Sequence, residues 1–398
     1  MGGIRAAGAG TGLSGAANAS AGCIVLTFER MTRIVEVAPA EKWVRVQPGV
    51  VGDDLRAVLA EQGLWYPPDP ASSPWPTIGG NIATNAGGMC CVKYGVTGDY
   101  VRELEVVTGT GEIVRVGRRT AKGVAGYDLA SLIVGSEGTL AVVTEAVLRL
   151  RPLPHPPLTI AGHFDSLIDA GRAVTAVAES GVIPSVLELV DEHCLRAVDD
   201  WKHLGLSLEA RAILIGRTDA PGELGAHEAR VLSECFAAGG ASFVAVSSDA
   251  LESEALYAAR RLAYPALERL GPVLTEDVCV PLLVVPDVLA LIGDIGRRHD
   301  VLIANVAHAG DGNLHPLIIT PPGDDAARVR AQRAFDDIIA AALAAGGTVT
   351  GEHGVGLLKL PGLAAELSPA VVDLHHAVKD ALDPHGILNP GKAIPPRG

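Results

Sequence analysis

The stretch Gly8-Ala-Gly-Thr-Gly-Leu-Ser-Gly15 decides which fold the first part of this chain can adopt. It contains GxGxxG at Gly10, Gly12 and Gly15, a pattern that indicates a Rossmann fold when a strand precedes it and a helix follows. We expect neither here, because no strand of useful length precedes the loop and residues 16–22 leave too little room for a helix before an apolar strand at Cys23–Phe28. Backbone N–H groups of a helix-free loop can still bind a pyrophosphate. The alternative is a flexible Gly-rich leader.

A second Gly-rich stretch, Thr77-Ile-Gly-Gly-Asn-Ile-Ala-Thr-Asn-Ala-Gly-Gly88, combines glycines with Asn and Thr side chains that can hydrogen-bond a ligand. Its small apolar residues, among them Ile78 and Ile82, suggest that the segment is buried. A buried polar segment needs a polar partner, and a bound cofactor would supply one. An ordinary surface loop is the alternative.

Short strands and helices surround these two stretches. A helix is predicted with Asp53 as its N-cap and Gly63 as its stop. The other predicted elements are strands at 34–37, 43–46 and 141–150, a hairpin at 101–107 and 112–116, and a short helix at 126–133. Four prolines in Arg151–Pro157 then predict a domain boundary.

The segment after this boundary alternates strands and helices, which predicts an antiparallel sheet covered by helices. The predicted strands are 158–164, 185–190, 211–215, 242–246, 278–280, 301–307 and 314–319. The predicted helices are 167–179, 223–238, 253–270, 286–299 and 327–345.

The stretch His308-Ala-Gly-Asp-Gly-Asn-Leu-His315 lies between two of these strands, and Asp311-Gly312 is a hairpin turn signal. If the turn is centred there, His308 pairs with Asn313 and His315 pairs with Val306. Side chains alternate between the faces of a strand, so both histidines then lie on one face, close enough to bind one metal ion. The alternative is a hairpin with two half-buried, hydrogen-bonded histidines.

The composition excludes several classes of protein. With 398 residues, two or more domains are expected. A net charge of −14 argues against a nucleic-acid binder, and no apolar run is long enough for an integral membrane segment. No signal peptide is visible, and six scattered cysteines without a CxxC pair favour a reduced, cytoplasmic chain.

The motifs in combination resemble a known family. Gly8–Gly15, Thr77–Gly88, Gly126-Tyr-Asp-Leu129 and Gly135-Ser-Glu-Gly-Thr-Leu140 resemble the FAD-binding domain of the vanillyl-alcohol-oxidase (PCMH-type) flavoproteins. The C-terminal motifs, His308…His315, Gly351-Glu-His-Gly354 and Asn389-Pro-Gly-Lys392, resemble the branch of D-lactate dehydrogenase, the glycolate oxidase FAD subunit and D-2-hydroxyglutarate dehydrogenase.

This resemblance implies an α+β fold: a two-subdomain PCMH-type FAD-binding domain, shortened at its N-terminus, over 1–152, and an α+β cap domain over 158–375. A tail over 376–398 would return to the FAD domain. Family members usually carry a further βαβ segment before the Gly-rich loop, whereas this chain starts almost at the loop.

The resemblance also implies a set of site residues. His308, His315 and Glu352 would hold a divalent metal (Zn, Mn or Fe), His353 would be the catalytic base, and Arg260 would bind the substrate carboxylate. The residues expected to bind FAD are Gly8, Ala9, Gly10, Thr11, Gly12, Leu13, Ser14, Gly15, Pro68, Asp69, Thr77, Gly80, Asn81, Thr84, Asn85, Gly88, Glu137, Gly138, Leu140 and Asn389.

The expected activity is oxidation of a small D-2-hydroxy acid, D-lactate or glycolate, with electrons passed to a quinone, cytochrome or electron-transfer flavoprotein. Leu317 stands where the hydroxyglutarate branch has an Asn, which favours the smaller acids. Two alternatives stay open: a D-2-hydroxyglutarate dehydrogenase-like enzyme, and a non-catalytic or cofactor-poor subunit of a multi-subunit glycolate oxidase. The expected location is cytoplasmic, with peripheral attachment at the inner membrane face and partner subunits as further options.

Overall fold

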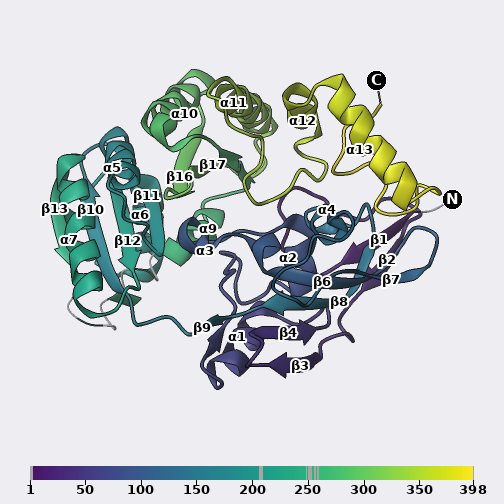
Figure 1. Cartoon of the computed structure of the whole chain (residues 1–398). Coiled ribbons are helices and arrows are strands. Elements are labelled where there is room, and N and C mark those ends of the chain that lie inside the picture. The colour runs from purple at the N-terminus through teal and green to yellow at the C-terminus, as the bar shows by residue number, and fades with distance from the viewer. Residues whose placement is uncertain are drawn as a thin grey trace. The chain divides into compact units, whose positions relative to one another are not determined.

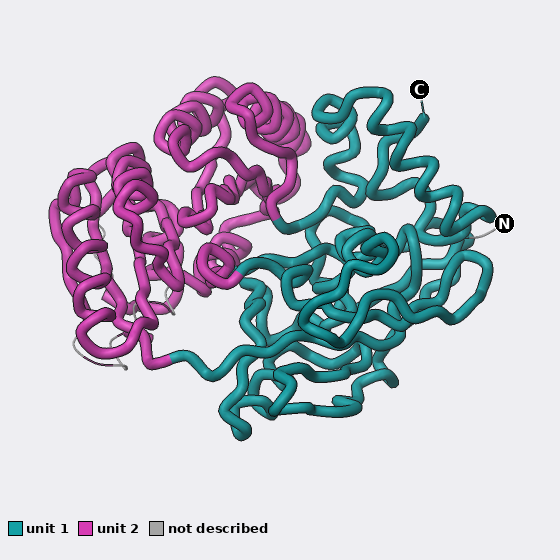
Figure 2. Tube along the Cα trace, in the orientation of Figure 1, with its two compact units in different colours: residues 1–88, 95–154, 352–398 teal, residues 89–94, 155–351 magenta. Residues whose placement is uncertain are grey.

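The computed structural model describes residues 3–205, 209–247, 249, 253–254, 257 and 260–397. The chain separates into two compact units (Figures 1 and 2): unit 1 comprises 1–88, 95–154 and 352–398, and unit 2 comprises 89–94 and 155–351. Apart from the short segment 89–94, the units divide at two places. The division at Pro154–His155 falls in the proline-rich stretch, and the other falls at Gly351–Glu352, whereas the returning tail was expected to start at 376.

Unit 1 is organised by an antiparallel sheet of order β3-β4-β8-β6-β7. Leu104 and Val106 of β6 face the core, while Glu103 and Glu105 on the opposite face form ion pairs with Arg115 of β7. This alternation is the period of a sheet with one buried face. The strands are β3 (Ile34–Ala38), β4 (Trp43–Val46), β6 (Val101–Val107), β7 (Ile113–Gly117) and β8 (Val142–Arg149), and a short pair joins β5 (Leu64–Trp65) to β9 (Arg151–Pro152).

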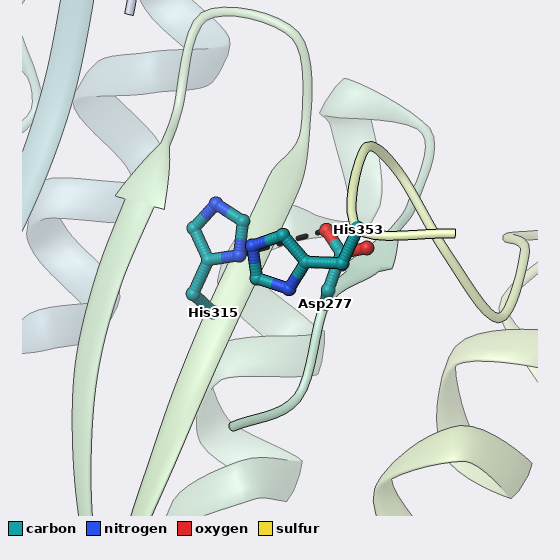
Figure 3. Close-up of side chains that lie close together, drawn as sticks. All are labelled: Asp277, His315 and His353. Carbon is teal, nitrogen blue, oxygen red and sulfur yellow. Dashed lines mark ion pairs between the residues drawn. The ribbon is translucent and has the colours of Figure 1, made fainter. Parts of the chain in front are cut away.

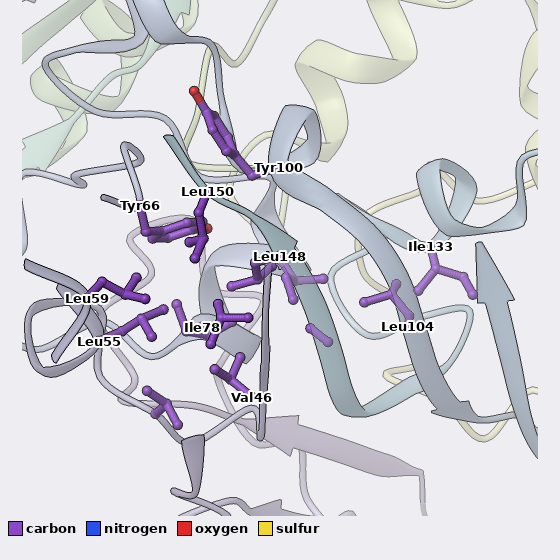
Figure 4. Packing of buried hydrophobic residues seen from close by; sticks show 14 of the residues in the cluster. Val46, Leu55, Leu59, Tyr66, Ile78, Tyr100, Leu104, Ile133, Leu148 and Leu150 are labelled. Carbon is purple, nitrogen blue, oxygen red and sulfur yellow. The ribbon is translucent and has the colours of Figure 1, made fainter. Parts of the chain in front are cut away.

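Two helices of unit 1 pack on this core and differ from expectation. In α1 (Gly52–Ala60) the N-cap is Val51, so the prediction of Asp53 was wrong; Asp53 instead accepts a hydrogen bond from Ser73 at 2.7 Å. The stretch predicted only as a buried segment forms α2 (Ile78–Thr84), which is capped by Thr77 and ended by left-handed Asn85. Its cap and its buried Ile78 and Ile82 outweigh the low helix propensity of Gly79-Gly80. Figure 4 shows Ile78 beside Leu55, Leu59 and Leu148 in this core.

A strand does precede the first Gly-rich loop. Residues Ile4–Ala7 form β1, which pairs in parallel with β2 (Ile24–Thr27). The expectation that no strand of useful length precedes the loop was therefore wrong. The sequence did not reveal β1 because the strand is only four residues long and two of them are alanine. No α-helix lies between β1 and β2, so the Gly-rich loop is not a Rossmann turn.

The remaining helices of unit 1 are short or C-terminal. They are α4 (Leu129–Ile133), α12 (Leu360–Glu366), α13 (Pro369–Leu382) and the 3-10 turn η1 (Thr97–Tyr100).

Unit 2 contains an antiparallel sheet of order β13-β10-β12-β11-β16-β17-β14, with β15 paired to β17, which confirms the antiparallel cap sheet. Its strands are β10 (Leu158–Phe164), β11 (Val186–Asp191), β12 (Ala212–Thr218), β13 (Ala241–Val246), β14 (Val273–Thr275), β15 (Val278–Cys279), β16 (Leu302–His308) and β17 (Asn313–Ile319). Its helices are α3 (Cys91–Tyr94), α5 (Leu167–Glu179), α6 (Glu192–Lys202), α7 (Gly222–Ala238), α9 (Ala263–Glu268), α10 (Val285–His299) and α11 (Asp325–Ala344), with the 3-10 turn η2 (Leu282–Val284).

Some elements of unit 2 were not predicted. Helix α6 follows β11 without a loop because Asp191, the last residue of the strand, is also the N-cap and accepts from the Cys194 N–H at 3.0 Å. Of the helix predicted over 253–270, the structure gives α9; residues 255–256 and 258–259 lie outside the described chain. Within the described ranges, no helix combines the length and apolar character needed to cross a membrane.

Candidate active site

The predicted histidine hairpin is confirmed in its register. His308 is paired with Asn313, and Val306 with His315, across β16 and β17. Gly312 has φ 79°, a left-handed conformation that the turn requires and that glycine adopts at low cost. This register places both imidazoles on the same face of the unit 2 sheet.

The two imidazole rings are buried and meet edge to face. Their centroids are 5.0 Å apart with an interplanar angle of 86°, and each residue exposes 5% of its surface or less. Ring nitrogens of His308 and His315 lie within 4.8 Å of each other, a separation at which both can bind one ion.

His308 is held by a buried carboxylate that sequence reasoning missed. Its Nδ1 lies 2.7 Å from Glu188 Oε1, and Glu188 is fully buried on the adjacent strand β11. The other Glu188 oxygen, Oε2, lies 2.8 Å from Arg260 Nε. Arg260, predicted to bind the substrate carboxylate, is thus an ion-paired, 4%-exposed side chain beside the histidine pair.

His315 has its own buried carboxylate, Asp277, also missed from the sequence. The His315 Nδ1 to Asp277 Oδ1 distance is 3.6 Å (Figure 3). Asp277 further accepts from the Asn313 side-chain amide at 2.8 Å and from the Thr350 hydroxyl at 2.6 Å. Its backbone carbonyl accepts from the Gly351 N–H at 3.1 Å. Neither acid lies in a recognisable motif; only the positions of Glu188 opposite His308 and of Asp277 just before β15 reveal them.

Glu352 and His353 follow Gly351 and begin the last segment of unit 1. They are partly buried, with His353 Nε2 3.7 Å from Glu352 Oε1. Within unit 1, Glu352 packs against the second Gly-rich stretch: a Cβ added to Gly87 would lie 2.5 Å from Glu352 Oε2.

A pocket in unit 1 is lined by residues of both Gly-rich stretches. Four of the predicted FAD-binding residues line it, namely Gly8, Thr77, Gly80 and Gly138. Gly8 is needed for this approach, because a Cβ there would lie 2.6 Å from the Thr77 hydroxyl. Asn81, the neighbour of the pocket residue Gly80, is 3% exposed. Its side-chain N–H₂ has no hydrogen-bond partner among the described residues, so it is a buried donor available to a ligand.

The middle of the first Gly-rich loop has free space beside it, and the end of the loop is hydrogen-bonded to a distant segment of unit 1. A Cβ at Gly10 or Gly12 would meet nothing within 4 Å. At the far end, the Ser14 carbonyl accepts from the N–H groups of Leu357 and Leu358 at 2.8 and 3.1 Å. Residues Ala9, Thr11, Leu13 and Gly15 complete the loop and do not line the pocket.

Glu137 and Asn389 form hydrogen bonds within unit 1 that join segments far apart in the sequence. Glu137, at φ 52°, accepts from the backbone N–H groups of Val355 and Gly356 at 2.7 and 2.9 Å. Burial raises the pKa of the Glu137 carboxyl, and these two hydrogen bonds oppose that rise. Asn389 donates to the Glu137 carbonyl at 2.7 Å, which joins the C-terminal segment to the Gly135–Leu140 motif.

The other predicted FAD-binding residues do not line the pocket. Thr84 donates back to the Gly80 carbonyl, and the Asn85 side chain accepts from the Gly98 N–H at 2.7 Å. Gly88 abuts Asp69, while Pro68 and Leu140 are buried.

Comparison with known proteins identifies both parts of the chain. Residues 3–117 match the family model "FAD binding domain", and residues 155–393 match "FAD linked oxidases, C-terminal domain". The glycolate oxidase subunit GlcD of Bacillus subtilis is 41% identical over 97% of this chain and 82% of its own length. A D-lactate dehydrogenase of Anaerostipes hadrus is 34% identical over 98% of this chain and 84% of its own length.

Solved structures agree on the fold. The 4-ethylphenol oxidase from Gulosibacter chungangensis superimposes with a TM-score of 0.80 at 18% identity, covering 100% of this chain and 86% of that one. p-Cresol methylhydroxylase gives a TM-score of 0.79 at 15% identity, over 98% and 84% of the two chains. The α+β, PCMH-type fold expected from the motifs is therefore confirmed.

Proposed function

The chain belongs to the FAD-linked oxidases and is an FAD-linked oxidoreductase, and on this premise we propose that it oxidises a small D-2-hydroxy acid, D-lactate or glycolate, to the 2-oxo acid. The observation that carries the proposal is the buried pair His308 and His315, backed by the carboxylates of Glu188 and Asp277. Relatives named as a glycolate oxidase subunit and a D-lactate dehydrogenase support the substrate class. Electrons would leave through a quinone, cytochrome or electron-transfer flavoprotein, with partner subunits an option.

The donors of unit 2 fit a divalent metal. Imidazole nitrogens suit Zn²⁺, Mn²⁺ or Fe²⁺, and ligating histidines commonly donate their second N–H to a carboxylate. The Glu188 carboxylate on Nδ1 of His308 supplies that partner and leaves Nε2 for the ion. His315 and Asp277 offer donor atoms within 4.8 Å of each other.

We assign Glu352 as a further ligand and His353 as the base by chain continuity. Gly351 is hydrogen-bonded to Asp277, and consecutive Cα atoms are about 3.8 Å apart. The Cα atoms of the next two residues therefore lie within roughly 8 Å of that of Gly351. Gly351 and Gly354 flank the pair and permit a local bend that points the two side chains in different directions.

We propose that the flavin nucleotide binds at the unit 1 pocket. Gly8 and Gly80 let the backbone approach closely, and the open middle of the Gly8–Gly15 loop presents N–H groups suited to a pyrophosphate. Glu352 packs against Gly87 in the same Gly-rich region, which supports a site where the acid is oxidised beside the cofactor.

Different residues have different roles in the proposed oxidation of the hydroxy acid. Arg260 binds the substrate carboxylate through its two Nη groups, since its Nε edge forms the ion pair with Glu188. His353 takes the hydroxyl proton, because an imidazole is a suitable base near neutral pH. When bound, the metal supplies a Lewis acid for the hydroxyl and FAD supplies the hydride acceptor.

Leu317 supports a small substrate. It is 1% exposed, packed in the apolar cluster that includes Ala304 and Leu267, and lies on the same strand face as His315. A second carboxylate on the substrate would find no polar side chain at this position.

Anaerobic flavin spectra with D-lactate, glycolate and D-2-hydroxyglutarate test the proposal. We expect the yellow absorbance of the holoprotein to bleach with one of the two smaller acids and to respond more weakly to hydroxyglutarate. A colourless protein that copurifies with partner subunits, or a flavin that none of the acids reduces, would contradict it.

A further inference from the structure

We propose that Glu188 is a positioning residue that orients the metal-binding nitrogen of His308 and the substrate-binding end of Arg260 with one carboxylate. The inference rests on the proposed function, since it assigns a shared support to the two groups that would hold the metal and the acid.

The geometry places Glu188 directly between its two partners. Strand β11 pairs with β16 so that Glu188 is the cross-strand neighbour of His308. Its Oε1 lies 2.7 Å from His308 Nδ1, and its Oε2 lies 2.8 Å from Arg260 Nε. Exposure is 0% for Glu188, 3% for His308 and 4% for Arg260, so solvent does not compete for these contacts.

The chemistry of the carboxylate fixes both partners. An ionised carboxylate only accepts hydrogen bonds, so the His308 nitrogen facing it must carry the proton and the other nitrogen, Nε2, is presented as the ligand. On the other side, the Nε edge of the guanidinium forms the ion pair with Glu188 Oε2, which leaves the planar Nη pair to meet a carboxylate with two parallel bonds.

Fold stability alone does not explain this arrangement. Replacing a buried ion pair by well-packed apolar residues is often neutral or stabilising, because removing two charges from water is costly. The same strand carries a second buried acid, Asp191, whose bonds run to the Cys194 N–H and to the backbone and side-chain N–H groups of Asn305. Asp191 therefore serves as a matched control for a buried carboxylate with a structural role.

The test compares Glu188→Gln with Asp191→Asn in the flavin-loaded protein stripped of metal. The Gln amide keeps the shape but can accept from only one of the two donors. Titration with Mn²⁺ should show a dissociation constant raised about 10–100-fold for Glu188→Gln. Asp191→Asn should lower the unfolding temperature and leave the Mn²⁺ affinity unchanged. With Mn²⁺ saturating, Glu188→Gln should raise KM for the hydroxy acid more than it lowers kcat, because Arg260 is misaligned.

A metal-independent readout keeps the two proposals distinguishable. Histidine ¹⁵N NMR of the metal-free protein should show the Nδ1–H tautomer for His308 in the wild type and a changed tautomer ratio in Glu188→Gln. If Glu188→Gln does not fold, Glu188→Asp keeps the charge on a shorter side chain and should give an intermediate Mn²⁺ affinity. Wild-type Mn²⁺ affinity and an unchanged tautomer in the variant that folds would overturn the positioning role. A wild type that binds no metal but shows the expected tautomer would contradict the proposed function instead.

Discussion

His353 is the residue on which the proposed proton transfer depends. His353→Ala should retain bound flavin and lose turnover by about 10²–10⁴-fold, the usual contribution of a positioned general base. Steady-state kinetics together with the flavin content of the purified variant check this. His299→Ala, which removes a histidine at the end of α10 that is hydrogen-bonded to Asp337 of α11, is the control and should keep full turnover. Normal turnover in His353→Ala would refute the assignment of the base.

A separate prediction concerns His308 and the metal content of the protein. His308→Ala removes one imidazole from a buried pair, so metal content per chain and reduction of the flavin by substrate should fall together. Elemental analysis and anaerobic spectra measure the two quantities. Unchanged metal content would show that His308 is not a ligand.

The sequence predicts that two side chains of one hairpin lie together, but it does not predict which residues of other strands contact them. The pairing of His308 and His315 follows from the Asp311-Gly312 turn and strand alternation. Glu188 and Asp277 come from β11 and from just before β15, and no local pattern connects them to the hairpin. The role of Arg260 was inferred by resemblance, and only the structure shows its bond to Glu188.

The Gly8–Gly15 loop gives a prediction at the scale of an element. Gly12→Val meets nothing within 4 Å of its Cβ and Gly12 has no left-handed φ, so the stability of the FAD-free protein should stay unchanged. If the open space beside the loop receives the pyrophosphate, FAD affinity should fall. Gly8→Ala, by contrast, should destabilise the FAD-free protein, because its Cβ would lie 2.6 Å from the Thr77 hydroxyl. Thermal unfolding measures the effect on stability, and FAD titration measures the effect on cofactor affinity. Wild-type FAD affinity in Gly12→Val would contradict the proposal that this loop binds the pyrophosphate.

The end of α13 gives a prediction about pH. Asp383 accepts from Lys379 and from the Ile387 and Leu388 N–H groups. Burial alone would raise the pKa of this carboxyl, but those donors hold it below its ordinary value of 3.8. A depressed carboxyl pKa stabilises the fold above the unfolded pKa, and this stabilisation is lost as the pH falls through the folded pKa.

Asp383→Asn should therefore lower the free energy of unfolding by about 1–3 kcal/mol at neutral pH, since the amide N–H₂ cannot accept from Lys379 and Leu388. The difference from wild type should shrink as the pH falls below 3.8. Chemical denaturation at several pH values measures it, and a difference that does not vary with pH would contradict the charge-based account.

Helices and strands with a strong apolar periodicity were predicted, whereas very short elements were missed. The span of α5 and the hairpin β6–β7 were predicted closely, because their apolar residues recur with the period of a helix or strand. Strand β1, strand β14 and helix α2 are between three and seven residues long, and tertiary contacts rather than local pattern stabilise them. Asp53 looked like a cap, yet the helix begins one residue earlier and uses none.

For the whole molecule, the order of the motifs along the chain predicts more than any one of them. The Gly-rich first part and the His-containing second part each match a family model, and the fold agrees with the solved structure of 4-ethylphenol oxidase. The return of residues 352–398 to unit 1 could not be located from sequence, because its start is a change of contacts within the Gly351–Gly354 motif and carries no linker composition. Substrate, metal and electron acceptor depend on side-chain details that family membership leaves open.

The central claim is that a small hydroxy acid reduces the flavin only when the metal is present. The most direct measurement is a single anaerobic titration of the holoprotein with D-lactate and with glycolate, repeated after chelation and again after Mn²⁺ or Zn²⁺ is restored. The account predicts that one acid bleaches the flavin, that chelation stops the bleaching while FAD stays bound, and that restored metal recovers it. Full bleaching by the acid in the chelated, metal-free protein would contradict the account.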